Sequence, residues 1–402
     1  MKVSAPVARR SILPAVRDRL HHEAGQVLPI AAVLAVVLVF MAALVLEGGN
    51  AFAQQRVTQN GSDAAANAGA VVLAERLGGA TRTDLEVLAR VTSVAGSNDI
   101  VNFLAEYTDV LGRPVDASGA VAASSGQPIA QVGGGSIPPN AQGVQFGGTR
   151  TFKTLIANAV GIGSFPASAD ATAVTGRLVG GGFLPVIFPI AISNCDGSGT
   201  TQPFTQDQWT TSDAPASPGG YPVGPEYIVP LCKTNPVGGG GGSGSFQILD
   251  LDPSLTCLEE TQNPPLIEWV SFPVDVPVDN GNNCAKPIAD EVNANLRLKP
   301  IMIPICDAFC VPSGSGSNAE YHVIGITAFY IDYMFDQNGG NAPECDGGAG
   351  ATGSGGDPLI NVIGGNGSSS CVWGWFIQFI TTGPVGSGPV GDTDAIGIQL
   401  IR

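Results

Sequence analysis

A run of 20 residues without a charge, residues 27–46, interrupts an otherwise mixed pattern of apolar and polar positions. At about 1.5 Å per residue, a helix of this length spans roughly 30 Å, which matches the hydrocarbon thickness of a bilayer. The pattern therefore predicts one membrane-spanning helix. This helix divides the chain into a short tail, residues 1–26, and a long remainder that begins at residue 47.

After this run, apolar positions recur at spacings of three and four over residues 51–77, which predicts a second helical stretch. Glu47, Gly48 and Gly49 are expected to loosen the helix between the two stretches. The recurring positions are small and form one stripe, which we expect to pack closely on a partner or on the same domain. The stripe contains Ala53, Val57, Gly61, Ala64, Ala68 and Val71.

Short helical and extended patterns alternate up to residue 180, which predicts a small α+β domain over residues 47–180. Thr83 is a candidate N-cap for a helix over residues 84–95. Further helical turns are expected over residues 100–106 and 152–160. Extended segments are expected at residues 129–132, 144–146 and 169–179.

Residues 181–402 carry many glycines and prolines, which favour turns and short strands over long helices. We expect a β-rich domain with one short helix over residues 290–298. Strands are expected at residues 301–306, 321–333, 371–382 and 395–401. The predicted fold class is therefore α+β, with a transmembrane helix that continues into an Ala-rich helix, a small α+β domain and a β-rich C-terminal domain.

An aromatic row marks the expected strand at residues 371–382. Trp373, Trp375, Ile377 and Phe379 share one face of the strand, because side chains alternate between faces. Such a row is compatible with a sugar-binding platform, but apolar residues also occupy the other face. We therefore favour a central strand that is covered on both sides.

Charge indicates how the chain is oriented in the membrane. Residues 1–26 carry five Lys and Arg residues, whereas residues 47–69 carry only Arg56. The positive-inside rule places the tail in the cytoplasm and the body outside it. The net charge of −16 argues against nucleic acid as a partner. Two alternatives to a retained anchor are a secretory signal cleaved near the Ala51-Phe52-Ala53 sequence and a pilin-type leader cleaved after Gly25.

All eight cysteines lie in the second half of the chain, and an even number outside the cytoplasm indicates disulfides. Eight cysteines allow 105 connectivities, and the sequence does not choose among them. Pairing of nearest neighbours is the simplest hypothesis. It gives Cys195–Cys232, Cys257–Cys284, Cys306–Cys310 and Cys345–Cys371.

Few residues suggest catalysis. His322 is the only histidine beyond the tail, and the sequence contains no H-E-x-x-H, G-x-S-x-G or Walker-type motif. Cys306-x-x-x-Cys310 has a spacing that zinc sites use, but no matching second pair accompanies it. We therefore predict no catalytic residue, no metal site and no cofactor, and we expect that the protein is not an enzyme.

A family resemblance becomes specific between residues 20 and 75. Gly25-Gln26 precedes the apolar run, Glu47-Gly48 follows it, and a polar helix then carries Gln59-Asn60 and an Ala-rich segment over residues 63–70. This order resembles the N-terminal module of the TadE/TadG-like Flp pilus-assembly proteins. The usual Asp-Val-Gly after the span is here Glu47-Gly48-Gly49, and the cysteine-rich half is not part of the shared module.

The resemblance implies a single-pass membrane protein whose partners are other pilus-assembly or cell-envelope proteins. Some members of the family carry a von Willebrand A domain, and Asp252-x-Ser254-x-Thr256 resembles the metal-binding signature of that domain. Mostly strands and loops follow, however, which argues against that domain.

We therefore predict a membrane-anchored extracytoplasmic structural or accessory component of Flp/Tad-type pilus assembly. Two other classes remain open. The protein could be a cell-surface module that binds a glycan or a protein, or a secreted hydrolase that depends on His322.

Overall fold

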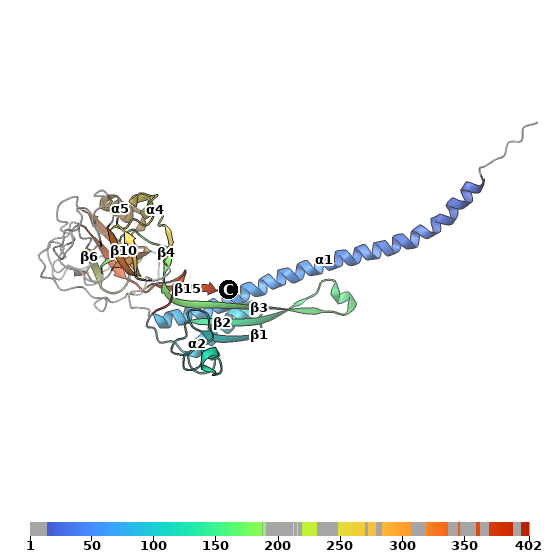
Figure 1. Cartoon of the computed structure of the whole chain (residues 1–402), viewed down its shortest axis with the longest axis horizontal. Helices are drawn as coiled ribbons and strands as arrows, with labels where there is room; N and C mark the ends of the chain where they lie inside the picture. The colour runs from blue at the N-terminus through green and yellow to red at the C-terminus, as the bar shows by residue number, and fades with distance from the viewer. Residues whose placement is uncertain are drawn as a thin grey trace, which may run out of the picture.

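The computed structural model describes the chain from residue 14 to residue 401 with gaps. The described residues are 14–186, 188–189, 212, 215, 219–230, 248–269, 272–278, 284–306, 313, 319–336, 345, 359–361, 370–388 and 395–401. One long helix projects from a body that contains both sheets, and the body lies at the C-terminal end of that helix (Figure 1).

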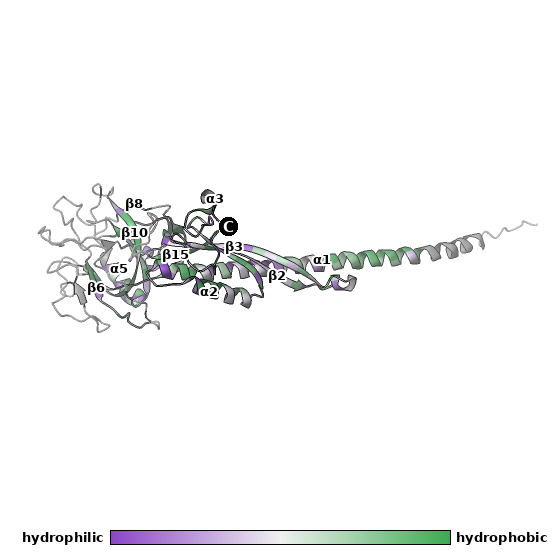
Figure 2. Cartoon of the chain, turned by 90° about the horizontal axis from the view of Figure 1, so that it is seen from below, coloured by the Kyte–Doolittle hydropathy of each residue, from purple (hydrophilic) through white to green (hydrophobic). Residues whose placement is uncertain are grey.

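The long helix, α1, runs without a break over Pro14–Leu77, a length of 64 residues. The expected loosening at Gly48 and Gly49 is therefore wrong, because both glycines have helical neighbours on either side. The apolar segment projects from the body, and none of its residues is buried (Figure 2). Among the described residues, α1 is the one helix whose length and composition would allow it to cross a membrane.

The first sheet has six strands in the order β1-β2-β3-β15-β13, with β14 paired to β3. Strands β1, β2 and β3 form an antiparallel meander, β15 is antiparallel to β3, and β13 is parallel to β15. The bounds are Asn102–Thr108 for β1, Gly143–Lys153 for β2, Ser164–Leu178 for β3, Ile380–Thr382 for β13, Val385–Gly386 for β14 and Ile396–Ile401 for β15.

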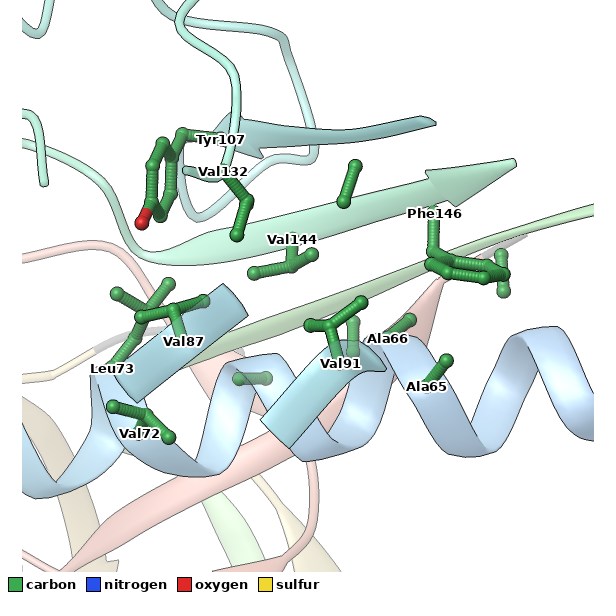
Figure 3. Packing of buried hydrophobic residues seen from close by; sticks show 14 of the residues in the cluster. Ala65, Ala66, Val72, Leu73, Val87, Val91, Tyr107, Val132, Val144 and Phe146 are labelled. Carbon is green, nitrogen blue, oxygen red and sulfur yellow. The ribbon is translucent and has the colours of Figure 1, made fainter. Parts of the chain in front are cut away.

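The C-terminal half of α1 packs on β2, β3 and β15, and helix α2, Asp84–Ser97, packs beside it. Figure 3 shows the apolar layer between them. Ala65, Ala66 and Leu73 come from α1, and they lie in one cluster with residues of α2 and of the sheet, which include Val87, Val91, Tyr107, Val144 and Phe146. The small α1 residues bring the helix close to the strands.

Two helical predictions in this unit are wrong. Residues 100–106 mainly form strand β1, and β2 extends to Lys153 where a helix was expected. Only a short 3-10 turn, η1 at Ala157–Val160, lies within the second predicted helix, and a short helix, α3, covers Ala122–Ser125. The helix after Thr83 is confirmed and ends two residues later than expected, and the strand predicted at residues 169–179 is confirmed but begins five residues earlier, as β3.

The second sheet has seven strands in the order β11-β6-β12-β10-β9-β5, with β8 paired to β10. The bounds are Phe188–Pro189 for β5, Glu226–Pro230 for β6, Val274–Pro277 for β8, Pro300–Cys306 for β9, Glu320–Asp336 for β10, Leu359–Asn361 for β11 and Ser370–Phe376 for β12. A separate pair joins β4, Gly180–Gly182, to β7, Leu266–Glu268.

Helices α4, Cys257–Gln262, and α5, Ala285–Glu291, contact each other, and α5 packs on β10. A π-helical turn, η3 at Val292–Leu296, follows α5, so the expected helix begins earlier and is partly a π-turn. Successive β10 residues fall in different apolar clusters on the two sides of the sheet, Phe329 in one and Tyr330 in the other. The second sheet is thus covered on both faces, and the predicted α+β class is confirmed.

The predicted strand at residues 371–382 is two strands in two sheets. Strand β12 lies between β6 and β10, whereas β13 belongs to the first sheet. The interpretation of the aromatic row as core is supported, because Trp375 is 0 % exposed and its Nε1 donates to the Gly224 carbonyl at 3.2 Å.

The C-terminal strands return to the first sheet, where β15 pairs with β3 over residues 172–177. A linear division into residues 47–180 and 181–402 therefore does not describe the two sheets. The second sheet is built from segments between β3 and β13, so it is an insertion between strands of the first.

Candidate functional site

The C-terminal half of α1 docks on the first sheet through a face of small residues. Gly61 and Gly69 leave little room for a side chain, Gly61 against the end of α2 and Gly69 against β2 and α2. A Cβ atom on Gly61 would lie 2.9 Å from Cβ of Asn98, and one on Gly69 would lie 2.9 Å from Cγ2 of Val144. The buried members of this docking face are Thr58, Gly61, Ser62, Ala65, Ala66, Gly69, Ala70 and Leu73.

Polar side chains of α1 continue the docking face toward the membrane-spanning segment. Gln55 Nε2 donates to the Ser168 carbonyl at 2.6 Å, Gln59 Nε2 to the Asp170 carbonyl at 3.0 Å and Ser62 Oγ to the Ala169 carbonyl at 3.1 Å. All three acceptors belong to the part of β3 that precedes its pairing with β15. The helix therefore satisfies strand carbonyls that lie beyond the β15 ladder.

The small-residue stripe that we expected is not the docking face. Ala53 is exposed, Val57 is 42 % exposed and Val71 is 38 % exposed, whereas Gly61 is the one stripe member that is buried. The docking face lies on a different side of α1 from the expected stripe and includes Thr58 and Ser62. Because these two residues are polar, a search for regularly spaced apolar residues does not find this face. Thr58 Oγ1 is satisfied within the helix by the Gln54 carbonyl at 2.9 Å.

Glu47 links the end of the apolar segment to the tip of the β2–β3 hairpin. Its carboxylate accepts backbone N–H groups from Leu155 at 3.1 Å, Ile156 at 2.8 Å and Ala157 at 3.5 Å. Charge-assisted bonds of this kind are about twice as strong as neutral ones. Glu47 therefore fixes the hairpin tip to the helix at the point where the charge-free run ends.

Asp84 forms a second buried anchor, at the start of α2. Its carboxylate accepts the Tyr107 hydroxyl at 2.7 Å and the backbone N–H groups of Gly133 at 2.8 Å and Gly135 at 2.7 Å. Burial, and then the hydrogen bond to Asp84, raise the pKa of Tyr107 well above its ordinary value. The cluster joins α2, β1 and a loop that are far apart in the sequence.

His322 lies on β10 opposite Asp275 on β8, and its Nδ1 is 2.8 Å from Asp275 Oδ1. Both side chains are exposed, and this arrangement is a cross-strand pair. Asp252 accepts the Ser254 N–H and hydroxyl, and these bonds lower the pKa of its carboxyl. Thr256 caps α4, so hydrogen bonds of a turn and a helix cap account for the von Willebrand-like spacing.

No group of three or more His, Cys, Asp or Glu side chains that could hold a metal ion occurs in the part of the chain that the structure describes. Two disulfides are described, Cys257–Cys284 and Cys345–Cys371, and both are nearest-neighbour pairs. Cys306 is also disulfide-bonded. Cys195, Cys232 and Cys310 lie outside the described residues.

Comparison with known families gives one match. Residues 25–72 match the family Tad, described as “Putative Flp pilus-assembly TadE/G-like”. Comparisons with curated proteins and with solved structures found no match. The matched segment contains the apolar run, Glu47 and most of the docking face, all on α1. The resemblance drawn from the sequence is confirmed for this segment, and the chain is a membrane-anchored protein related to Flp pilus assembly.

Proposed function

We propose that the protein is an extracytoplasmic structural component of a Flp/Tad-type pilus-assembly apparatus. Its N-terminus lies in the cytoplasm, α1 crosses the membrane once, and both sheets lie outside the cytoplasm. Its role is to hold the body at a set height and orientation above the membrane. No chemical step is required of it.

One observation carries the proposal. The TadE/G-like segment, residues 25–72, is a continuous part of one helix whose apolar beginning is unburied and whose end is buried in a protein core. A continuous helix of this kind fixes the distance between the membrane and the body, because an α-helix rises by about 1.5 Å per residue. The matched segment thus has the form of a rigid connector between a bilayer and a folded body.

The orientation is supported by charge. Arg17 and Arg19 lie on the N-terminal side of the apolar segment, in the first turns of α1, and the next arginine on the other side is Arg56. Basic residues are retained on the cytoplasmic side of a membrane helix. The disulfides point to the same side for the body, since disulfides persist in oxidising compartments.

The orientation is tested with an alkaline phosphatase reporter fused after Gly79, because this enzyme is active only outside the cytoplasm. We expect an active fusion, and a matched fusion within residues 1–13 should be inactive. The reverse pattern would contradict the proposed topology.

The assembly role is tested by deleting the gene and counting surface pili by electron microscopy. Pili should be lost and should return with the wild-type gene. Complementation with Gly69→Leu should fail, because the added side chain meets Val144 and Val91. The control Asn60→Leu, on an exposed position of the same helix, should restore pili. Normal pili in the deletion strain would refute the assembly role.

A further inference from the structure

The tip of the β2–β3 hairpin, residues 154–163, is apolar and carries no charged side chain. It is also exposed where a loop in water is normally polar: Leu155 is 65 % exposed and Ile162 is 45 % exposed. Phe165 and Ile156 add further exposed apolar surface beside them. A contiguous apolar surface of this kind on a protein marks an interaction site.

The hairpin tip lies beside the membrane-spanning part of α1, not beyond it. A groove of about 440 Å³ separates the two, with Phe40, Ala43 and Leu44 on the helix side and Ile156, Ala157 and Phe165 on the hairpin side. The hairpin runs along α1 in both views, and its tip reaches the projecting part of the helix (Figures 1 and 2).

The depth of the tip follows from the rise of the helix. Phe40 precedes Glu47 by seven residues, which corresponds to about 10 Å along α1. Interfacial protein segments bury apolar faces about 5–10 Å into the boundary between headgroups and acyl chains. If α1 crosses the bilayer with residues 27–46, the hairpin tip lies within that zone.

Many backbone N–H groups of the tip have hydrogen-bond acceptors within the protein, as a segment in contact with lipid requires. Non-helical segments at membrane depth need partners for their backbone groups. The N–H groups of Leu155, Ile156 and Ala157 donate to Glu47. Those of Thr154, Gly161 and Ile162 donate to carbonyls within the tip, and the Thr154 hydroxyl donates to the Ile162 carbonyl.

A lysine, Lys153, directly precedes the tip in the sequence and lies further from the apolar segment of α1. Lys153 is exposed, and its carbonyl accepts from Asn50 Nδ2 at 3.4 Å, about one helical turn beyond Glu47. If residues 27–46 span the bilayer, this height is the level of the lipid headgroups. A lysine followed by an apolar tip is the pattern of a membrane segment that places its charge at the interface and its apolar residues in the hydrocarbon.

We propose that the hairpin tip dips into the outer leaflet and that lipid acyl chains occupy the groove between the tip and α1. Lipid is the occupant because one wall of the groove is the membrane-spanning helix itself, so the groove opens directly onto its lipid-facing surface. The proposal rests on the proposed anchoring of α1. It adds a second point of contact, so the body is held against rotation and tilt as well as at a set height.

The test uses the full-length protein in nanodiscs, with an indole introduced at the tip by Leu155→Trp. The native tryptophans all follow residue 200, so they provide a constant background. Emission is compared in ordinary lipids and in lipids with brominated acyl chains. The emission added by Leu155→Trp should be quenched by bromine and should lie at shorter wavelength than that of an indole in water.

Two matched variants make the result decisive. Leu111→Trp lies on an exposed turn after β1, near the start of β2 and about 33 Å along the strand from the tip, so its emission should not change. Leu38→Trp, in the apolar segment, should be quenched if α1 is embedded. Quenching at Leu38→Trp without quenching at Leu155→Trp would overturn the tip proposal and leave the anchor intact. Quenching at neither position would overturn both.

Discussion

Single buried carboxylates organise the first unit, by which we mean the first sheet with α2 and the C-terminal half of α1; the second unit is the second sheet with α4 and α5. Asp84 is 4 % exposed and accepts three hydrogen bonds from groups on β1 and on the loop at residues 133–135. Replacing it with alanine would leave two N–H groups and a hydroxyl without an acceptor. We expect Asp84→Ala to lower the free energy of unfolding by about 3 kcal/mol.

Thermal unfolding of the purified full-length protein measures this loss. Glu86→Gln is the control, because it removes the charge of a partly exposed carboxylate on the same turn of α2 and leaves an amide oxygen that can still accept from Thr83. An Asp84→Ala protein as stable as the Glu86→Gln protein would show that the buried cluster has no stabilising role.

Asp116 should give the first unit a pH dependence at low pH. Hydrogen bonds from the Ser118 hydroxyl, and from backbone N–H groups, lower the pKa of the Asp116 carboxyl to about 2. Its pKa in the unfolded chain is about 3.9. Since the folded state favours the charged form, this stabilisation is complete above about pH 4 and is lost as the pH falls to about 2.

We expect Asp116→Asn to be less stable than the wild type at neutral pH, and its stability should fall less steeply between about pH 4 and pH 2. Chemical denaturation at a series of pH values measures both effects. Parallel pH curves for the two proteins would contradict the assignment.

At the residue scale, local patterns were predictable and distant partners were not. The cap at Thr83 could be predicted because Thr83 and Glu86 have the spacing of a capping box, and both of its hydrogen bonds are present. The backbone N–H groups that donate to Asp84 lie 49 and 51 residues further along the chain. No local pattern indicates such a contact.

At the scale of helices and strands, the spacing of apolar residues gave some wrong predictions. Residues 100–106 can be read as helix, but tertiary pairing with β2 makes them a strand. On α1, the docking face could not be located from apolar spacing, because it contains hydroxyl and glycine positions. The strand β10 was predictable, since its apolar residues continue over both faces.

Because the chain is closely packed around Gly69, we expect that a larger side chain at this position is not tolerated. A Cβ atom there would lie 2.9 Å from Val144 Cγ2 and 3.0 Å from Val91 Cγ2. Overpacking of this kind costs about 1–3 kcal/mol, so Gly69→Leu should destabilise the first unit by about 3 kcal/mol. Asn60→Leu, on the exposed side, should cost less than 1 kcal/mol by the same reasoning. Equal losses, measured by denaturant unfolding, would show that the face is not closely packed.

In the molecule as a whole, the second sheet is an insertion whose ends return to the first. The disulfide Cys257–Cys284 joins α4 to α5 across 27 residues within this insertion. Closing a loop of that length stabilises a fold by about 3 kcal/mol. The double variant Cys257→Ser, Cys284→Ser should therefore lower the unfolding transition of the second unit.

Calorimetry of the full-length double variant checks this prediction, and the transition of the first unit should stay where it is. If only the transition temperature of the first unit shifted, the disulfide would not stabilise the second sheet, which would contradict this prediction. The insertion itself was not predictable, because strand order depends on pairing between residues 177 and 396.

The central claim is that one unbroken helix both spans the membrane and forms the core of the body. Its most direct test is the distance between spin labels, carried by a noncanonical amino acid, at positions Val39 and Val71 of the full-length protein in nanodiscs. The 32 residues between them correspond to about 48 Å in a continuous helix. The account predicts a narrow distribution near this distance. A broad distribution at clearly shorter distances would show a break near Gly48 and Gly49 and would contradict it.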